Sequence, residues 1–386
     1  MTKVLHVVLN QVTKDTRVLK EVESLGRNGY QVTVLGVQND AGDLPAVEAH
    51  PFFKITRIKL STKKLPKVRL LQYLKYMEYL FRAVRFAREY SPAIIHCHDL
   101  NALPVGVLSR ARQIIYDSHE FHRGRDAQGR FMNLSSGLIE NLLAKRADII
   151  ISVNEEIALR LQSILGRDVS CILNADRRAD SGALPGENGM TLREKLSIPK
   201  EVKIIVYAGR LFAGRGLVNL LKMVPYLKNS VVIIMGEGPF LPNLQALIEK
   251  DHLSGKAFLV PAVPYRDVSR YLSTTDLGII PSANTSESYF LSLGNKFFHY
   301  VAAGIPVAVP ERPVLRQILK KYGIGIVIDT GNPEAMAEEI NRMFDNEEHY
   351  REYRARVAKA AAEFNWDNEE KKLVGLYAGL AGSKIP

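Results

Sequence analysis

The chain has 386 residues, which is more than a typical single domain holds and therefore predicts two domains. Apolar residues make up 46% and charged residues 24% of it, so a disordered, collagen-like or coiled-coil protein is excluded. The formal net charge is +11, and residues 54–88 alone carry +10, with eleven Lys or Arg against the single acid Glu78. The remainder is close to neutral, which argues against a nucleic-acid partner bound along an extended basic face.

The cysteine content and the lengths of the apolar runs indicate in which cellular compartment the protein is expected. The two cysteines, Cys97 and Cys171, lie far apart without metal-ligand spacing, so neither a disulfide framework nor a zinc site is predicted, and a reducing cytosol fits. The first apolar run, residues 4–9, is interrupted by His6 and is too short for a signal peptide, and no run is long enough to span a bilayer. We therefore expect a cytoplasmic protein, soluble or peripheral to a membrane.

The first half alternates short β-branched runs with helical patterns. The runs predict buried parallel strands over residues 4–9, 32–36, 93–98, 113–118, 148–153 and 169–173. Residues 15–28 place Val18, Val22 and Leu25 on one helical face and end among glycines, which predicts a helix after the first strand.

A polar, glycine-rich and proline-containing stretch with a short helix follows over residues 176–200 and is interpreted as a linker. A second series then predicts strands over residues 203–209, 231–236, 257–262, 276–282, 305–310 and 325–330. The sequence thus predicts an α/β protein of two doubly wound, Rossmann-like domains, residues 1–175 and 201–365, facing a central cleft. Residues 366–386 are expected to form a helix that can pack back on the first domain. Ligands of such domains bind at the carboxyl ends of the strands.

The segment 207–221, YAGRLFAGRGLVNLL, is suited to an anion. Gly209 ends a predicted strand, Arg210 and Arg215 follow five residues apart, and Gly216 opens a helix. Glycines permit close backbone approach, helix starts offer free N–H groups, and guanidinium groups bind phosphate oxygens in pairs. The alternative is a glycine turn with two solvated arginines.

A second glycine turn, MGEGPF at residues 235–240, joins the next strand to a helix. Gly236 and Gly238 would therefore line the same sheet edge and could take part in a nucleotide site. An ordinary tight turn explains them equally well.

Histidines follow two strands of the first half. His119 follows Asp117 at a strand end and is the candidate that can reach into the predicted cleft. His96 and His98 are expected to support loops or the strand end. A metal site is not predicted for them, because a single residue separates them and no third ligand lies nearby in the sequence.

Residues 281–310 carry a further motif, and the order of all these motifs along the chain is typical of one protein family. The sequence GRLxxxxG, GEGP, PS with a polar loop and NKFFHYVAAGIPV resembles the retaining GT-B glycosyltransferases of family four, and the similarity spans nearly the whole chain. It implies sugar transfer from a nucleotide diphosphate sugar with retention of anomeric configuration, without a cofactor or divalent metal. The first domain would bind the acceptor and the second the donor.

The resemblance also implies roles for single residues. Arg210 and Arg215 match positions that bind the donor diphosphate and neutralise the leaving group, with Arg215 standing where lysine is commoner. The position that matches His119 lies against the donor sugar.

One part of the motif differs from that family. Members commonly carry two glutamates eight residues apart, and here these positions are Leu291 and His299. A carboxylate accepts hydrogen bonds from both ribose hydroxyls, whereas a neutral imidazole accepts only one. Glu287 could supply a replacement carboxylate or be a solvated loop residue, and Asn295 and Lys296 could face the donor or serve as a helix cap and a surface residue.

The basic segment contains a helical pattern over residues 68–90, with a predicted buried stripe of Leu70, Leu71, Leu74, Met77, Leu80, Val84 and Ala87. The cations on its other faces, interleaved with aromatic residues, favour an anionic membrane or an acceptor, although a solvated helix face is the alternative. The predicted patch comprises Lys63, Lys64, Lys67, Arg69, Lys75, Arg82 and Arg85.

Together these observations predict a glycosyltransferase that uses a nucleotide-sugar donor and a glycan or lipid-linked acceptor, in cell-surface polysaccharide or glycolipid synthesis. It would be bound to the inner face of the membrane. Two alternatives stay open: a non-catalytic partner on the same fold, since both usual glutamates are replaced, and a sugar-nucleotide epimerase.

Overall fold

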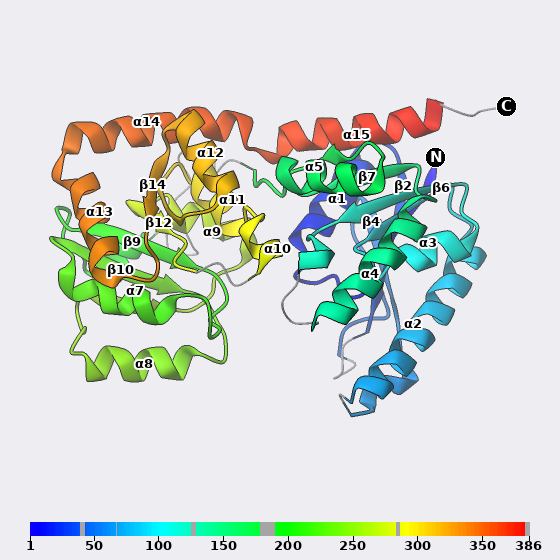
Figure 1. Ribbon diagram of the computed structural model, residues 1–386, viewed down its shortest axis with the longest axis horizontal. Helices are drawn as coiled ribbons and strands as arrows, with labels where there is room; N and C mark the ends of the chain where they lie inside the picture. The colour runs from blue at the N-terminus through cyan, green and yellow to red at the C-terminus, as the bar shows by residue number, and fades with distance from the viewer. Residues whose placement is uncertain (39–42, 67, 125–128, 178–189, 283–285, 383–386) are drawn as a thin grey trace. The chain divides into compact units, whose positions relative to one another are not determined.

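The computed structural model describes all residues except 39–42, 67, 125–128, 178–189, 283–285 and 383–386. The chain divides into two compact units (Figure 1). The N-terminal unit comprises Met1–Leu173 together with Glu369–Pro386, and the C-terminal unit comprises Asn174–Asn368. The described part of the predicted linker therefore lies in the C-terminal unit, and the last helix begins there and continues in the N-terminal one.

The N-terminal unit is built on an eight-stranded sheet of order β3-β4-β2-β1-β5-β6-β7-β8. Its neighbouring strands are parallel except for the antiparallel pair β3 and β4. The strands are β1 (Lys3–Val7), β2 (Gln31–Val37), β3 (Val47–Ala49), β4 (Phe53–Ile58), β5 (Ile94–His98), β6 (Gln113–Ser118), β7 (Ile149–Ser152) and β8 (Ser170–Cys171). β3 and β4 were not predicted, because neither forms an apolar run: the edge strand β3 has no buried residue, and in β4 only Ile55 and Arg57 are buried.

The helices of this unit connect the parallel strands. They are α1 (Thr16–Arg27), α2 (Arg69–Tyr90), α3 (Leu103–Ser109), α4 (Gly129–Ala144), α5 (Glu155–Leu165) and the two short 3₁₀ turns η1 (Ser61–Lys64) and η2 (His122–Gly124). Asp15 caps α1, since its side chain accepts a hydrogen bond from the Val18 amide. The last helix, α15 (Trp366–Gly382), returns to this unit, where the Gln113 side chain donates to the Leu380 carbonyl.

The stripe predicted for α2 is partly wrong. Leu74 and Met77 are 51% and 57% exposed, whereas Ala87 is buried as predicted, together with Tyr79 and Ala83, which the predicted stripe did not include. The helix packs through Tyr79, Ala83 and Ala87 because the small alanines allow close approach to the strands and α3. Leu71, Leu80 and Val84 are half-buried, and the side chain of Leu70 lies outside the described residues. We use the name α2 ridge for the exposed apolar side chains of this helix, which are Tyr73, Leu74, Met77 and Phe81.

The C-terminal unit contains an entirely parallel six-stranded sheet of order β11-β10-β9-β12-β13-β14. The strands are β9 (Lys203–Ala208), β10 (Ser230–Met235), β11 (Ala257–Val260), β12 (Leu277–Ile279), β13 (Val307–Pro310) and β14 (Gly325–Ile328). All six were predicted from apolar runs. The strand order reverses at β9 here and at β1 in the N-terminal unit, which confirms two doubly wound domains.

Helices again join the strands of this unit. They are α6 (Leu192–Lys195), α7 (Leu217–Met223), α8 (Leu241–Lys250), α9 (Tyr265–Leu272), α10 (Glu287–Phe290), α11 (Asn295–Ala302), α12 (Pro313–Tyr322), α13 (Pro333–Asp345), α14 (Glu347–Glu363) and the 3₁₀ turn η4 (Val224–Tyr226). The core lies between the sheet and the helices α7, α8 and α13. The loops after β9, β12 and β13 emerge on either side of the strand reversal, where doubly wound folds bind ligands.

Candidate functional site

The loop after β9 carries the two predicted arginines. Arg210 is exposed and its guanidinium lies 5.2 Å from the centre of the Phe212 ring. Arg215 is half-buried just before α7, and its guanidinium donates to the Tyr289 hydroxyl. The two arginine side chains therefore have different surroundings: Arg210 lies at the surface beside Phe212, and Arg215 contacts Tyr289 of α10.

Lys296, in the first turn of α11, joins the same region. Its ammonium lies 4.8 Å from the centre of the Tyr207 ring. Gly209 makes room for it, because a Cβ on that glycine would lie 2.9 Å from Lys296 Cε. Burial, with Arg215 and Arg312 adding to it, lowers the pKa of Lys296 to about 8.

Arg312 completes the group and was not predicted. It stands between β13 and α12, is 2% exposed, and donates to the Ser282 carbonyl at 3.1 Å. Its guanidinium lies 4.7 Å from the centre of the Tyr289 ring, and burial lowers its pKa. Its place at the carboxyl end of a central parallel strand was the signal that could have identified it. We call Arg215, Lys296 and Arg312 the cation cluster.

Gly236 and Gly238 allow the loop after β10 to lie against the loop after β9. A Cβ on Gly236 would approach the Gly209 carbonyl oxygen to 1.8 Å, and a Cβ on Gly238 would approach the Leu211 carbonyl oxygen to 2.2 Å. The Leu211 amide also donates to the Glu237 carbonyl at 2.8 Å. Close loop packing therefore accounts for both glycines, and a nucleotide contact at this turn stays a prediction.

His299 has a carboxylate partner that the sequence did not suggest. Its Nδ1 is hydrogen-bonded to Asp176, a residue of the predicted linker, and the Tyr265 hydroxyl donates to the same carboxylate. The side chains of His299 and Asp176 are 13% and 8% exposed. The carboxylate accepts a hydrogen bond from Nδ1–H, so Nε2 is left as the acceptor of a neutral His299.

The other predicted residues of this unit lie on α10 and α11. Glu287 begins α10 with an exposed side chain, and Leu291, which ends α10, is buried. Asn295 is exposed at the start of α11, where its side-chain Oδ1 accepts a hydrogen bond from Asn174 Nδ2 at 2.9 Å. None of these contacts adds a carboxylate to the cation cluster.

In the N-terminal unit, His119 follows β6 and is 18% exposed. Its Nε2 lies 3.1 Å from Asp117 Oδ2, and its backbone amide donates to Asp99 Oδ1 at 3.0 Å. Burial alone would lower the pKa of His119, but the two carboxylates outweigh it and raise the pKa to about 9. His119 is therefore a cation at neutral pH.

Beneath His119 lies a buried polar group that the sequence revealed only in part. Arg17 from α1 binds Asp117 in a bidentate pair with N–O distances of 2.8 and 2.9 Å. Although burial opposes it, Arg17 and His119 hold the pKa of Asp117 well below its usual range. His96 and His98 lie beside this pair on β5, fully or almost fully buried.

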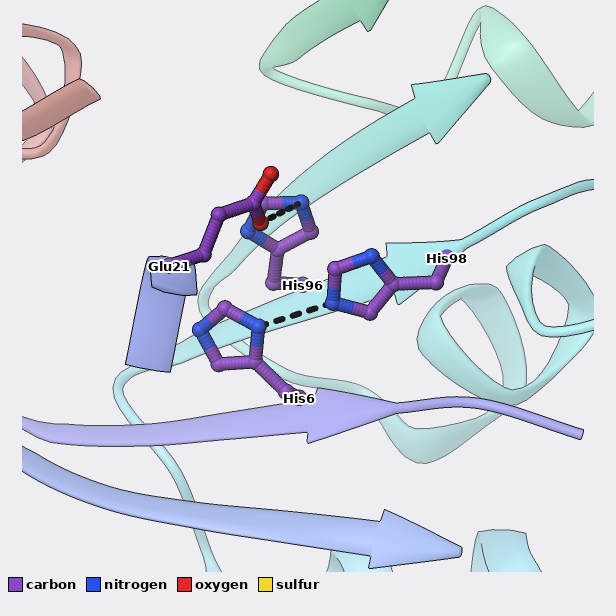
Figure 2. A group of neighbouring side chains, drawn as sticks. All are labelled: His6, Glu21, His96 and His98. Carbon is purple, nitrogen blue, oxygen red and sulfur yellow. Dashed lines mark hydrogen bonds and ion pairs between the residues drawn. The ribbon is translucent and has the colours of Figure 1, made fainter. Parts of the chain in front are cut away.

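Two further residues of that group came from distant parts of the sequence. His6 on β1 is paired in register with His96, and Glu21 comes from α1 (Figure 2). One candidate ligand atom from each of His6, Glu21, His96 and His98 lies within 4.8 Å of the others, and the same holds for His98, Asp117 and His119. These groups have the composition of a metal site. Two of the ring nitrogens, however, His6 Nδ1 and His98 Nε2, face each other at 2.8 Å, which is a hydrogen-bond distance.

The predicted basic patch is only partly described. Lys67 lies outside the described residues, and so do the side chains of Lys63, Lys64 and Arg69, which stand in η1 and at the start of α2. Lys75 donates to the Leu65 carbonyl at 2.7 Å. Arg82 and Arg85 form ion pairs with Glu78 and Glu89 at 2.8 and 2.7 Å, which reduces their free charge.

Comparisons with known proteins agree with this architecture. Residues 15–171 match the model of a glycosyl transferase 4-like domain, and residues 190–364 match that of glycosyl transferases group 1. The chain is 22% identical to a D-inositol 3-phosphate glycosyltransferase of a Nocardioides species, over 74% of this chain and 66% of that protein.

Two solved structures share the fold. Sucrose-phosphate synthase of Thermosynechococcus elongatus superposes with a TM-score of 0.82 at 16% identity, covering 100% of both chains. Anabaena HepE in complex with UDP-glucose gives a TM-score of 0.75 at 15% identity, covering 98% of this chain and 100% of that one. The two matched models together account for most of the chain, and it belongs to the GT-B glycosyltransferases.

Proposed function

We propose that the protein transfers a sugar from a nucleotide diphosphate sugar to a glycan or lipid-linked acceptor with retention of anomeric configuration. The C-terminal unit would bind the donor and the N-terminal unit the acceptor, in the synthesis of a cell-surface polysaccharide or glycolipid. HepE, which shares the fold, was solved in complex with UDP-glucose, and this supports a nucleotide-sugar donor.

The cation cluster carries this proposal. Its members approach one another around the rings of Tyr289 and Tyr207. The pKa of Lys296 is lowered by burial and by the positive charges of Arg215 and Arg312. A diphosphate bound here would offset their mutual repulsion. During transfer, the same cations would stabilise the charge that develops on the departing nucleoside diphosphate.

His299 is proposed to replace the usual ribose-binding glutamate. With Nδ1–H held by Asp176, its Nε2 lone pair can accept a hydrogen bond from one ribose hydroxyl. The Asp176→Asn variant should therefore weaken donor binding, because the proton of neutral His299 is then no longer held on Nδ1 and can occupy Nε2. The cation cluster stays intact in this variant.

His119 is proposed to bind a substrate hydroxyl. Its Nε2 lies against Asp117, whereas its Nδ1 is 4.0 Å from Asp99 Oδ2, beyond hydrogen-bond distance. The Nδ1–H of the cation can therefore donate to a substrate oxygen.

Calorimetry with a panel of nucleotide sugars and nucleoside diphosphates tests the donor proposal. We expect one nucleoside diphosphate and its sugar to bind, and the anomeric proton signal of the product to show retention. Activity should survive a metal chelator. A protein that binds none of these compounds contradicts the proposal, and binding without transfer or hydrolysis would indicate the non-catalytic alternative.

We further propose that the protein is cytoplasmic and binds the inner face of a membrane through the α2 ridge and the cations around it. Tyr73, Met77 and Phe81 are 57%, 57% and 70% exposed and recur every four residues, so they share one face of α2. None of the described helices is long and apolar enough to cross a bilayer. Exposed apolar side chains beside Lys and Arg suit an anionic lipid surface.

Co-sedimentation with vesicles of phosphatidylglycerol tests this surface. Phe81→Asp should reduce the bound fraction several-fold, because it places a carboxylate where an apolar side chain would enter the lipid. Leu159→Asp on α5 is the matched control, since Leu159 is similarly exposed at 63% but lies outside the ridge. Equal binding of both variants, or binding that does not weaken in salt, would contradict the proposal.

A further inference from the structure

The buried histidines of the N-terminal unit form a continuous line of hydrogen-bond contacts. His119 Nε2 lies 3.1 Å from His98 Nδ1, and His98 Nε2 lies 2.8 Å from His6 Nδ1. His6 Nε2 lies 3.3 Å from the Tyr377 hydroxyl of α15, which lies 2.7 Å from His96 Nδ1. His98 and His6 each use one ring nitrogen toward each neighbour, as a continuous donor–acceptor chain requires.

The line ends at a carboxylate. His96 Nε2 faces Glu21 Oε2 at 3.7 Å, as Figure 2 shows, and neither atom has a hydrogen-bond partner within the described part of the chain. A movement of ~1 Å would bring the two atoms to hydrogen-bond distance. Asp117 Oδ2 is also 3.7 Å from His96 Nε2, but the bidentate pair with Arg17 keeps Asp117 ionised, so Glu21 is the carboxylate that can take up the proton. His96 and Glu21 are both fully buried, so only the His119 end of the line is exposed.

The protonation of His119 gives the line one direction. Burial lowers the pKa values of His6, His96 and His98, so each carries a single N–H at neutral pH. The Nε2 atom of protonated His119 lies 3.1 Å from both Asp117 Oδ2 and His98 Nδ1, so the two share its proton and His98 Nδ1 is an acceptor. His98 then donates from Nε2 to His6, His6 from Nε2 to Tyr377, and Tyr377 from its hydroxyl to His96 Nδ1.

We infer that His98, His6, Tyr377 and His96 form a proton relay between His119 and the carboxylate of Glu21. In one passage, His119 gives its Nε2 proton to His98 Nδ1, and each following group gives its own proton to the next acceptor. His96 finally gives its Nε2 proton to Glu21. His119 becomes neutral, Glu21 becomes a carboxylic acid, and the total charge is unchanged. The relay rests on the proposed function only for the statement that His119 meets a substrate.

Both end states have support around them. With the proton on His119, its cation lies beside Asp117, and the Glu21 carboxylate lies 3.0 Å from Arg17 Nε. With the proton on Glu21, every bond of the line reverses, and His98 Nδ1–H faces Asp117 Oδ2 at 3.4 Å. Burial raises the pKa of Glu21 to about 8 against the effect of Arg17, close to the pKa of about 9 for His119. The other charged or titratable groups around the line are Asp15, Tyr30, Asp99 and Cys171.

A metal ion explains the geometry less well. Two nitrogen ligands on a tetrahedral zinc ion are about 3.3 Å apart. His6 Nδ1 and His98 Nε2 are closer than this, at 2.8 Å, and their ring planes differ by 27°. The Arg17 guanidinium beside Glu21 would also repel a cation.

Nitrogen-15 NMR of the histidine-labelled full-length protein, without substrate, tests the relay. At pH 8.5, between the pKa of about 8 for Glu21 and that of about 9 for His119, we expect His6, His96 and His98 all to be neutral with the proton on the same ring nitrogen, Nε2, and His119 to be protonated on both. A mixed set, in which one of the three inner rings differs from the others, would break the line and overturn the inference.

The Tyr377→Phe variant breaks the line at one hydroxyl. Because His6 then loses the acceptor of its Nε2–H, we expect the titration midpoint of His119 to fall by ~0.5 pH unit. Tyr30→Phe is the matched control, since the Tyr30 ring packs edge-on against Tyr377 at 5.5 Å between centres but makes no contact in the line. Equal midpoints in the wild type and both variants would contradict the relay.

Zinc supplies the opposing result. If added zinc chloride bound in a 1:1 ratio and shifted the nitrogen signals of His6, His96 and His98 together, the residues would be a metal site and the relay would be rejected. None of these measurements uses nucleotide binding, so a protein that fails to bind any donor leaves the relay fully testable, and calorimetry tests the donor independently.

Discussion

In the N-terminal unit, the buried cation Arg17 lies between two carboxylates, with Asp117 in a bidentate pair and Glu21 at 3.0 Å. In the C-terminal unit, Lys296 lies over an aromatic ring, and its charged neighbours are two arginines. The first arrangement balances its charge within the protein. The second leaves a positive site, and an anionic ligand would balance it. Removing a cation should therefore destabilise the first unit and mainly affect ligand binding in the second.

The largest effect is expected for Arg17→Met. The substitution leaves the Asp117 carboxylate buried without its cation, which should lower the free energy of unfolding by about 3–5 kcal/mol in chemical denaturation. Arg27→Met is the control on the same helix, because Arg27 pairs with Glu23 at the surface and should cost ~1 kcal/mol or less. Similar losses in the two variants would contradict the balance attributed to the buried pair.

The second prediction concerns Glu21, the carboxylate that Arg17 does not fully compensate. The folded-state pKa of about 8 lies above the ordinary glutamate value of 4.5, so the folded protein binds more protons than the unfolded chain between these two values. Stability should therefore fall as pH rises from 4.5 to 8, by up to about 1.4 kcal/mol per unit from this group.

Glu21→Gln should remove that dependence, so the free energy of unfolding of the variant should increase relative to that of the wild type as the pH rises from 4.5 to 8. Denaturation curves at pH 5, 6.5 and 8 measure the difference. Glu23→Gln, on the exposed side of the same helix, should leave the wild-type dependence in place. Parallel curves for the wild type and Glu21→Gln would show that Glu21 titrates normally.

Sequence patterns predicted the parts of this comparison that depend on local order. The strands of the C-terminal unit are continuous apolar runs because both faces of a parallel sheet are covered, so all six could be located. Arg215 and Lys296 were found because a glycine turn and a family motif mark their positions.

Other members of the two clusters lie outside any local sequence motif. Arg312 stands between Glu311 and Pro313 with no glycine turn around it, so its place after a predicted strand was the one signal for it. His6 is a single polar residue inside an apolar strand, and Tyr377 reaches His96 across 281 residues of sequence. The stripe of α2 was predicted wrongly because a helix with apolar residues on several faces does not reveal which one the sheet will cover.

The third prediction moves to the cation cluster. Lys296→Met should leave stability unchanged or slightly raised, since it removes a buried charge that lies near two others. Affinity for the nucleoside diphosphate should fall ~10–100-fold, the value of a charge-assisted hydrogen bond to phosphate. Calorimetry and denaturation of the same variant measure both quantities. Lys222→Met, at an exposed position of α7, is the control and should change neither. A large loss of stability with unchanged affinity would place Lys296 in the same class as Arg17.

The smallest effect is the pH dependence of donor binding. Burial lowers the pKa of Lys296 to about 8, so the free protein loses this proton at a pH where the unfolded lysine would keep it. A bound diphosphate favours the charged form and raises the pKa again, so binding takes up a proton above pH 8. The dissociation constant should therefore rise with pH between 8 and the higher pKa of the complex, by at most about tenfold per unit. Calorimetry at pH 7, 8 and 9 would reveal the slope, and Lys296→Met should abolish it. A slope that persists in the variant would assign the proton to another group of the donor site.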